Sequence, residues 1–187
     1  EGTVFKTLAK DAYDAIDHWV NSYYKNLAKD FISERSLQFR DTQFPHVLMY
    51  GKIDLTERDA SGMITITDFK TGSSKTSGMI EKIDDDGRMS DLLRQLARYS
   101  YLVRGSEKGK DVAVSRLLFL EASATDKNAC YATHIDDEKI DLLIRDIGEY
   151  DESLKNGSWV DRECHFKSYG KGDDACEYCA RANTIYR

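Results

Sequence analysis

The sequence predicts an α/β domain. Two runs within residues 48–72 alternate apolar and polar side chains about a short polar connection, which is typical of two paired strands. Residues 3–29, 89–104 and 136–155 instead repeat apolar side chains at intervals of three and four, the period of an amphipathic helix. Strands therefore alternate with helices along the chain, as in the α/β class.

Composition indicates one globular domain spanning 1–187, with a cysteine-bearing tail at 156–187. Hydrophobic residues make up 41% and charged residues 32% of the 187 residues, enough for one core. No apolar run reaches membrane-spanning length and no signal-peptide pattern is present, so we expect a cytoplasmic protein with no membrane partner. The chain begins without methionine, so we expect a fragment. The net charge of −6 argues against a free-standing, non-specific DNA binder.

The chain opens with a predicted core helix at residues 3–29, whose apolar side chains recur with helical spacing. Residues 31–41 follow as a first strand, which contains Glu34. The two central strands come next. The helix stripe consists of Leu8, Ala12, Ala15, Ile16, Trp19, Val20 and Tyr23.

The second central strand carries charges on the face expected to meet the core. Side chains alternate faces with period two, so Ile66, Asp68 and Lys70 share one face. A charge on such a face is costly unless it has a partner, a metal or a catalytic task. Pairing of the two strands would bring the carboxylate of Asp54 beside that of Asp68. Two clustered carboxylates and one lysine suit a divalent metal and a phosphodiester.

A polar loop and further regular elements follow the central strands. The loop spans residues 71–88, where Lys75 could contact a phosphate or simply face solvent. Ser90 or Asp91 is expected to cap the next helix, and Asn156-Gly157 to end the last one. The remaining elements are a helix at 89–104, strands at 112–121 and 129–135, and a helix at 136–155.

The helix at 89–104 carries polar side chains beside its apolar stripe. Gln95 and Tyr99 are four residues apart and therefore share one face. A buried glutamine needs hydrogen-bond partners. Arg94 and Arg98 lie on neighbouring faces, where they could contact phosphates or face solvent.

These motifs together resemble the RecB-like branch of the PD-(D/E)xK nucleases. The G-x-I-D motif of that branch matches residues 51–54. After a hairpin connection of 13 residues, its D-[YF]-K-T-G motif matches residues 68–72. Its Q-x-x-x-Y motif matches residues 95–99. The resemblance implies a restriction-endonuclease-like core, a central mixed β-sheet flanked by helices. It also implies metal-dependent hydrolysis of DNA. RecB/AddB-type and UvrD-like helicase–nucleases, which process double-strand breaks, carry such domains, so a helicase domain or subunit is the expected partner.

The resemblance also implies the metal ligands. Asp54, Asp68 and the backbone carbonyl of Phe69 would bind Mg²⁺ or Mn²⁺, with help from Glu34, because hard cations prefer oxygen ligands. Such a metal polarises the phosphate and activates a water molecule. Lys70 would hold that water and counter the developing charge.

By the same resemblance, Gln95 would hold the DNA backbone or the attacking water, with Tyr99 beside it. One position departs from the pattern near the start of the chain. Residues 2–8 resemble a G-T-x-x-H-x-x-L segment whose histidine contributes to the metal site, but Lys6 stands in its place. His18 lies about 18 Å further along the helix, too far to replace it readily.

The tail leaves several interpretations open. Cys176 and Cys179 form a C-x-x-C pair, as in part of this nuclease branch, where a third tail cysteine and one cysteine upstream complete an iron–sulfur cluster. Here Ile185 occupies the position of the third tail cysteine, and no cysteine precedes Asp54. Zinc held by Cys164, Cys176, Cys179 and either His165 or an outside ligand is an alternative. We favour a remnant pair without a ligand.

Three functions therefore stay open. The first is an active metal-dependent deoxyribonuclease, an exonuclease or endonuclease in double-strand-break repair and recombination. The second is a degenerate nuclease fold that binds DNA or a partner without cutting, which Lys6 and Ile185 would favour. The third is an unrelated α/β domain, which predicts no divalent metal at Asp54 and Asp68. Cleavage of DNA separates the first two.

Overall fold

The computed structural model describes residues 2–107, 110–121 and 129–158 and is built around a five-stranded sheet. The strand order is β1-β2-β3-β4-β5. The β3–β4 pair is parallel and the other pairs are antiparallel, so the expected mixed sheet is confirmed. The strands are β1 (Asp30–Phe39), β2 (Met49–Arg58), β3 (Ile64–Lys70), β4 (Val112–Phe119) and β5 (Cys130–Thr133).

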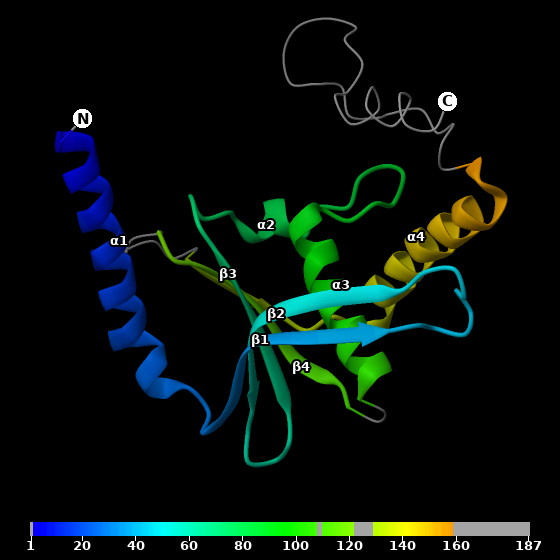
Figure 1. Ribbon diagram of the computed structural model, residues 1–187, viewed down its shortest axis with the longest axis horizontal. Coiled ribbons are helices and arrows are strands. Elements are labelled where there is room, and N and C mark those ends of the chain that lie inside the picture. Colours follow the sequence, from blue (N-terminus) through cyan, green and yellow to red (C-terminus); the bar gives the residue numbers. More distant parts are fainter. Residues whose placement is uncertain (1, 108–109, 122–128, 159–187) are drawn as a thin grey trace, which may run out of the picture.

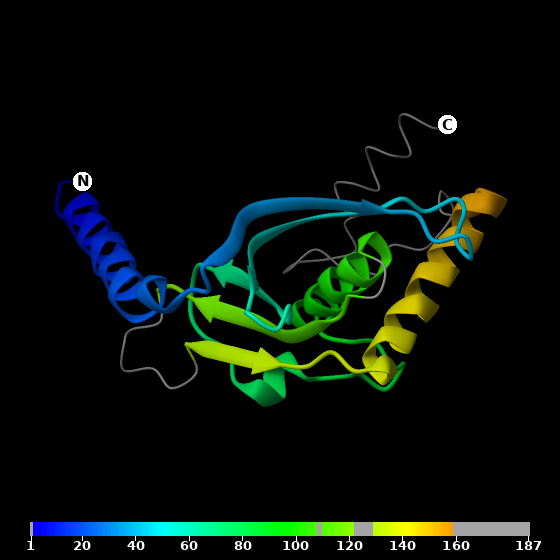
Figure 2. The ribbon, with the colours of Figure 1, turned by 90° about the horizontal axis from the view of Figure 1, so that it is seen from below.

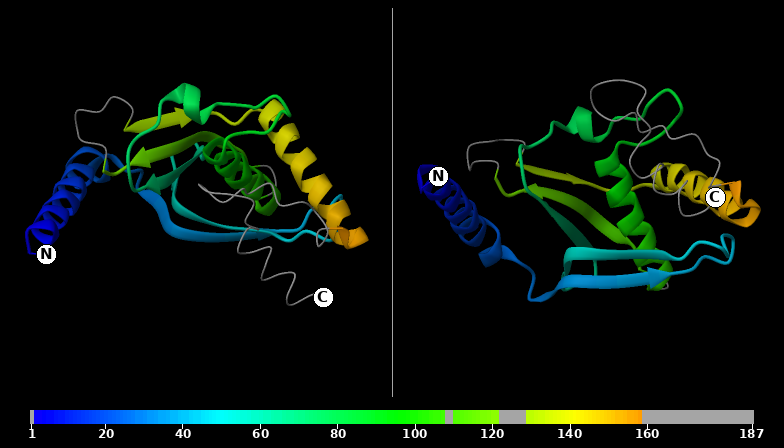
Figure 3. Two further views of the ribbon diagram at one scale, coloured as in Figure 1. Left: turned by 90° about the horizontal axis from the view of Figure 1, so that it is seen from above. Right: turned by 45° about the horizontal axis from the view of Figure 1, so that its top comes forward.

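Helices flank this sheet. α3 packs against β1, β2 and β4, and α4 packs on α3 (Figure 1, Figure 2). α1 lies at the opposite end of the sheet from α4 (Figure 3). Within the described ranges, none of the helices has the length and apolar character needed to cross a membrane. The helices are α1 (Gly2–Ser22), the 3-10 turn η1 (Tyr24–Asn26), α2 (Ser77–Ile80), α3 (Asp91–Ser106) and α4 (Asp137–Asn156).

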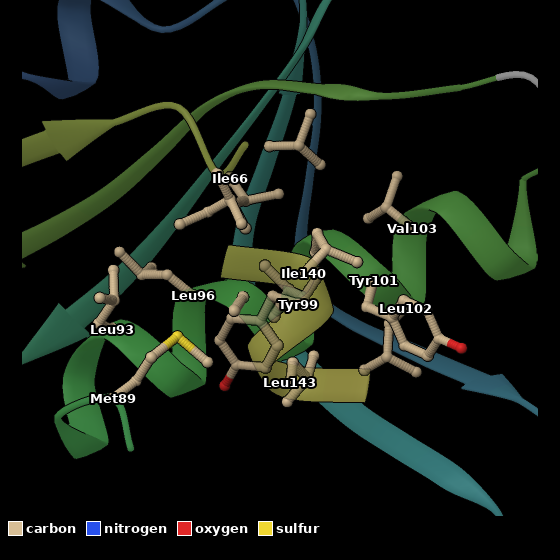
Figure 4. Close-up of a cluster of buried hydrophobic side chains, with 14 of the residues drawn as sticks. Ile66, Met89, Leu93, Leu96, Tyr99, Tyr101, Leu102, Val103, Ile140 and Leu143 are labelled. Atoms are coloured by element: carbon tan, nitrogen blue, oxygen red, sulfur yellow. The ribbon is translucent and has the colours of Figure 1, made fainter. Parts of the chain in front are cut away.

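The core lies between α3, α4 and one face of the sheet (Figure 4). Ile53 and Ile66 from the sheet are fully buried, as are Leu93, Leu96 and Leu102 from α3. Burying a side chain of this size contributes about 1.5–3 kcal/mol, so this layer fixes α3 on the sheet. α4 extends the core with Ile140, Leu143 and Ile147.

Helix ends follow the capping rules. The Ser90 side chain accepts the Leu93 N–H at the start of α3, which confirms the predicted cap. The Asp136 side chain accepts the Lys139 N–H at the start of α4. Gly157 ends α4 in the left-handed conformation at φ 70°, where glycine has no steric penalty.

The prediction that the first helix belongs to the core is wrong. Val4, Phe5 and Leu8 are 64%, 72% and 63% exposed. The last turns of α1 do meet the sheet, where the Trp19 ring packs edge-to-face on that of Phe69 with 5.8 Å between centroids. Apolar periodicity identifies a helix face, but what covers that face depends on tertiary packing.

The strands of the central hairpin extend beyond the two motifs, so the connection between them is short. β2 continues to Arg58, so residues 59–63 form the whole connection. The Asp59 carboxylate accepts the N–H groups of Ser61 and Met63, and Gly62 takes a φ of 85°. The polar loop at 71–88 is also more ordered than expected, because it contains α2 and buries Ile80 completely.

Candidate active site

β2 and β3 part at the position of the two carboxylates. Their paired residues end at Leu55 and Thr67, whereas β3 continues beside β4 to its last residue. The N–H of Phe69 donates instead to Asp54 Oδ2 at 2.7 Å. Figure 1 shows β1 and β2 turning away from β3 and β4. Where the backbone pairing of β2 and β3 has ended, the Asp54 carboxylate therefore accepts the hydrogen bond that a strand carbonyl would otherwise accept from Phe69.

α3 holds the carboxylate of Asp68, which is only 3% exposed. Gln95 Nε2 donates to Asp68 Oδ1 and to the Tyr99 hydroxyl, both at 3.0 Å. The Tyr99 hydroxyl lies 3.4 Å from Asp68 Oδ1. Lys70 Nζ donates to Gln95 Oε1 at 2.6 Å and lies 2.8 Å from Asp68 Oδ2. Residues from β3 and α3 therefore form one closed polar network.

The network leaves Asp68 with a perturbed acidity. Burial raises the pKa of the Asp68 carboxyl, and the charge of Asp54 adds to that effect. The ammonium of Lys70 opposes the increase in pKa without overcoming it. Burial likewise raises the pKa of Tyr99. Ionised Asp68 is therefore held at a free-energy cost that a bound cation would relieve.

The donor set fits a divalent cation. Asp68 Oδ2 is buried and accepts no hydrogen bond within the described part of the chain, with the Lys70 ammonium as its close contact. Asp54 supplies a second carboxylate from the neighbouring strand, and carboxylate oxygens are the ligands that Mg²⁺ prefers. In residues 2–107, 110–121 and 129–158, no three His, Cys, Asp or Glu side chains cluster as a ready-made metal site. Any site here would rest on these two carboxylates, backbone oxygen and water.

Comparison with known families supports this interpretation. The family model of the PD-(D/E)XK nuclease superfamily matches residues 5–184. The chain belongs to the PD-(D/E)XK nuclease superfamily. Membership identifies the polar network as lying in a nuclease fold. No curated protein sequence matches this PD-(D/E)XK chain significantly.

Solved structures agree on the fold. A protein from Eubacterium rectale, provisionally assigned as an exonuclease, superposes with a TM-score of 0.54 at 16% identity over 92% of this PD-(D/E)XK chain. The structure of SSO0001 gives 0.41 at 15% identity over 76% of the chain, a value too low to show a common fold. The PD-(D/E)XK chain spans 59% of the length of each of these two structures.

The glycine of the first motif has a packing role in the PD-(D/E)XK chain. A Cβ atom at Gly51 would lie 2.6 Å from Leu102 Cδ1 and 3.3 Å from Tyr99 Cε1. A Cβ at this position would require the Leu102 side chain to shift, so glycine lets β2 lie close to α3. The Tyr99 ring, whose hydroxyl group reaches Asp68, lies at the same contact.

Glu34 lies apart from the network. It takes a φ of 54°, in the left-handed region, although residues on either side of it pair regularly with β2. Its carboxylate forms an ion pair with Lys52, and both side chains are more than half exposed. Glu34 would have to leave Lys52 to assist a metal at Asp54.

The predicted arginines flank the network on α3. Arg94 pairs with Asp91 at 2.5 Å, and the Arg98 guanidinium lies 5.9 Å from the centroid of the Tyr99 ring. Lys75 lies in the segment between β3 and α2. These positions are compatible with phosphate contacts, which stay a prediction.

The other sequence candidates lie elsewhere. Lys6 is exposed on α1, roughly 20 Å along the helix from Trp19, and that end of the helix stands away from the sheet (Figure 1). His18 lies within hydrogen-bond distance of the Ser22 hydroxyl, at 3.3 Å, so neither residue joins Asp68. The tail candidates Cys164, His165, Cys176, Cys179 and Ile185 lie outside the described residues.

A groove beside the network contains residues that the sequence motifs did not indicate. It has a volume of about 660 Å³ and lies between β2, α3 and α4. Gln95 lines it, together with Tyr50 and Tyr150. Exposed tyrosines outside the apolar stripe of a helix or strand carry no periodic signal, so only the fold could bring these two together.

Proposed function

We propose that this chain is a metal-dependent deoxyribonuclease domain of the RecB-like branch, acting in the cytoplasm on DNA. The observation that carries this proposal is the closed network in which α3 holds Asp68 and Lys70 next to Asp54. The Q-x-x-x-Y motif supplies Gln95, whose side chain contacts both Asp68 and Lys70. Such a network rigidly orients a carboxylate and an ammonium, as catalysis requires.

Asp54, Asp68 and the carbonyl of Phe69 would hold the cation. When bound, Mg²⁺ or Mn²⁺ supplies positive charge for the phosphate and makes a water molecule more acidic. Hydrolysis forms one bond from phosphorus to the water oxygen and breaks one bond to the leaving sugar oxygen. Lys70 counters the negative charge that builds up during this exchange. Gln95 and Tyr99 keep the Asp68 carboxylate oriented through their hydrogen bonds to Oδ1.

A helicase domain or subunit would deliver the DNA, and double-strand-break repair is the proposed setting. The net charge of −6 supports an attached partner, because it gives little general attraction to DNA.

Cleavage of linear single- and double-stranded DNA with Mg²⁺ or Mn²⁺ tests this function. We expect cleavage by the wild type and none by Asp68→Ala, whereas Asp85→Ala removes an exposed loop carboxylate and stays active. Equal cleavage by Asp68→Ala would contradict the proposal.

A catalytically degenerate domain is the second candidate, because Lys6 replaces the family histidine and lies far from Asp68. No cleavage by a folded wild-type chain that binds DNA, alone and with its helicase, would favour this candidate.

A further inference from the structure

The groove between β2, α3 and α4 has an apolar floor and an aromatic rim. Val47 and Met49 from β2 and its approach lie in the floor with Leu143 and Ile147 from α4, and all four side chains are buried. Tyr50 and Tyr150 stand at the rim, 59% and 50% exposed. Large exposed aromatic side chains over an apolar floor are typical of binding surfaces rather than of solvated surface.

This groove leads to the catalytic network. Gln95 lines the groove and also contacts Asp68 and Lys70 within the network. On β2, the exposed Tyr50 lies four residues before Asp54, or about 13 Å along the strand. A chain lying in the groove would therefore pass Gln95, which contacts Asp68 and Lys70.

The charges of the groove are balanced. Arg94 and Arg98 line it, but so do Asp91 and Asp146. Asp91 pairs with Arg94, and Arg98 lies beside the ring of Tyr99. A duplex presents mainly phosphates to a protein, and its affinity for this groove would depend on a positive surface that is not present here. A single strand also presents the faces of its bases.

We propose that this groove binds single-stranded nucleic acid, with bases stacked on Tyr50 and Tyr150 and the backbone against Arg94 and Arg98. The inference rests on the proposed function, since it assigns the substrate form and the approach to that same site. Stacking tolerates any base, so the groove would hold a strand without reading its sequence. Two arginine contacts predict a shallow dependence on salt, with a slope near −1.4 in log–log form.

Fluorescence anisotropy tests the inference without relying on catalysis. The probes are a labelled 20-nucleotide poly(dT), an abasic strand of equal length and a 20-base-pair duplex, each with the full chain and Ca²⁺ in place of Mg²⁺. Tyr50→Ala and Tyr150→Ala should each weaken poly(dT) binding about 5- to 100-fold. Tyr50→Phe and Tyr150→Phe keep the ring and should bind normally. Tyr13→Ala removes an exposed tyrosine of α1 and serves as the control.

The outcomes separate this inference from the proposed function. Unchanged poly(dT) binding by both alanine variants overturns the inference, as does equal binding of the abasic strand or tighter binding of the duplex. If the wild-type chain cleaves DNA but any of these contrary binding results is obtained, the nuclease proposal stands and the groove assignment fails. If the wild type binds poly(dT) through the tyrosines but never cuts, the groove assignment stands and the nuclease proposal fails.

Discussion

Gln95 Nε2 lies 3.0 Å from Asp68 Oδ1, so an amide on α3 fixes the orientation of a buried carboxylate on β3. At the other end of the same amide, Gln95 Oε1 accepts a hydrogen bond from the Lys70 ammonium at 2.6 Å. An amide offers a donor and an acceptor at once, whereas a glutamate side chain offers only acceptors when ionised. Glutamine therefore suits this position, where one end of the side chain meets a carboxylate and the other an ammonium.

Gln95→Glu should shift the pH dependence of cleavage. A second negative charge beside Asp68 disfavours ionisation of its carboxyl, so the pKa rises above its already raised value. If cleavage needs ionised Asp68, the acidic limb of the kcat profile moves to higher pH. Gln43→Glu adds the same charge at an exposed position and should leave the profile in place. An unchanged profile in Gln95→Glu would contradict the link between these two residues.

Lys70→Ala should abolish cleavage, with a loss of at least about 100-fold in kcat, because no other ammonium in the described network can counter the developing charge. Removing this ammonium also leaves the buried carboxylate of Asp68 without its counter-charge, so stability should fall at neutral pH and recover as Asp68 becomes protonated at lower pH. Cleavage assays and thermal unfolding measure the two effects. Lys75→Ala is the matched control, and a fully active Lys70→Ala would refute the assignment.

Asp68→Asn should remove activity without lowering stability at neutral pH. The pKa of Asp68 is raised in the folded state, so the folded chain binds a proton more tightly than the unfolded chain. The contribution of Asp68 to the free energy of unfolding therefore falls as the pH rises from its pKa in the unfolded chain through its pKa in the folded chain. Asparagine does not ionise, so its advantage in Tm should grow with pH over that interval. Added Mg²⁺ should raise the Tm of the wild type and not that of the variant.

Thermal unfolding of both proteins at several pH values, without and with Mg²⁺, measures these differences. A variant that is less stable than the wild type at every pH in the absence of metal would show that the Lys70 contact outweighs burial.

Gly51→Ala should destabilise the chain by about 1–3 kcal/mol, because the added Cβ lies 2.6 Å from Leu102 Cδ1. Displacement of Tyr99 should also reduce cleavage. Gly78→Ala places the same group in open space on α2 and should be tolerated. Denaturant unfolding compares the two variants, and equal stability would show that Leu102 moves aside freely.

The site could be predicted from sequence where its residues are local. Strand alternation places Asp68 and Lys70 on the core face, and helical spacing places Gln95 and Tyr99 together. Contacts between distant segments were not accessible in this way. The groove joins Tyr50 to Tyr150 across one hundred residues, and the exposure of Phe5 depends on what packs against α1, which periodicity does not specify.

α1 has a mechanical consequence for the site. It is a rigid rod about 32 Å long whose far end is free of the sheet and whose near end rests on Phe69 through Trp19. Phe69 in turn donates its N–H to Asp54. A displacement of α1 near Phe5 would therefore reach the strand that carries Asp68 and Lys70 through the contact between Trp19 and Phe69, without touching either residue.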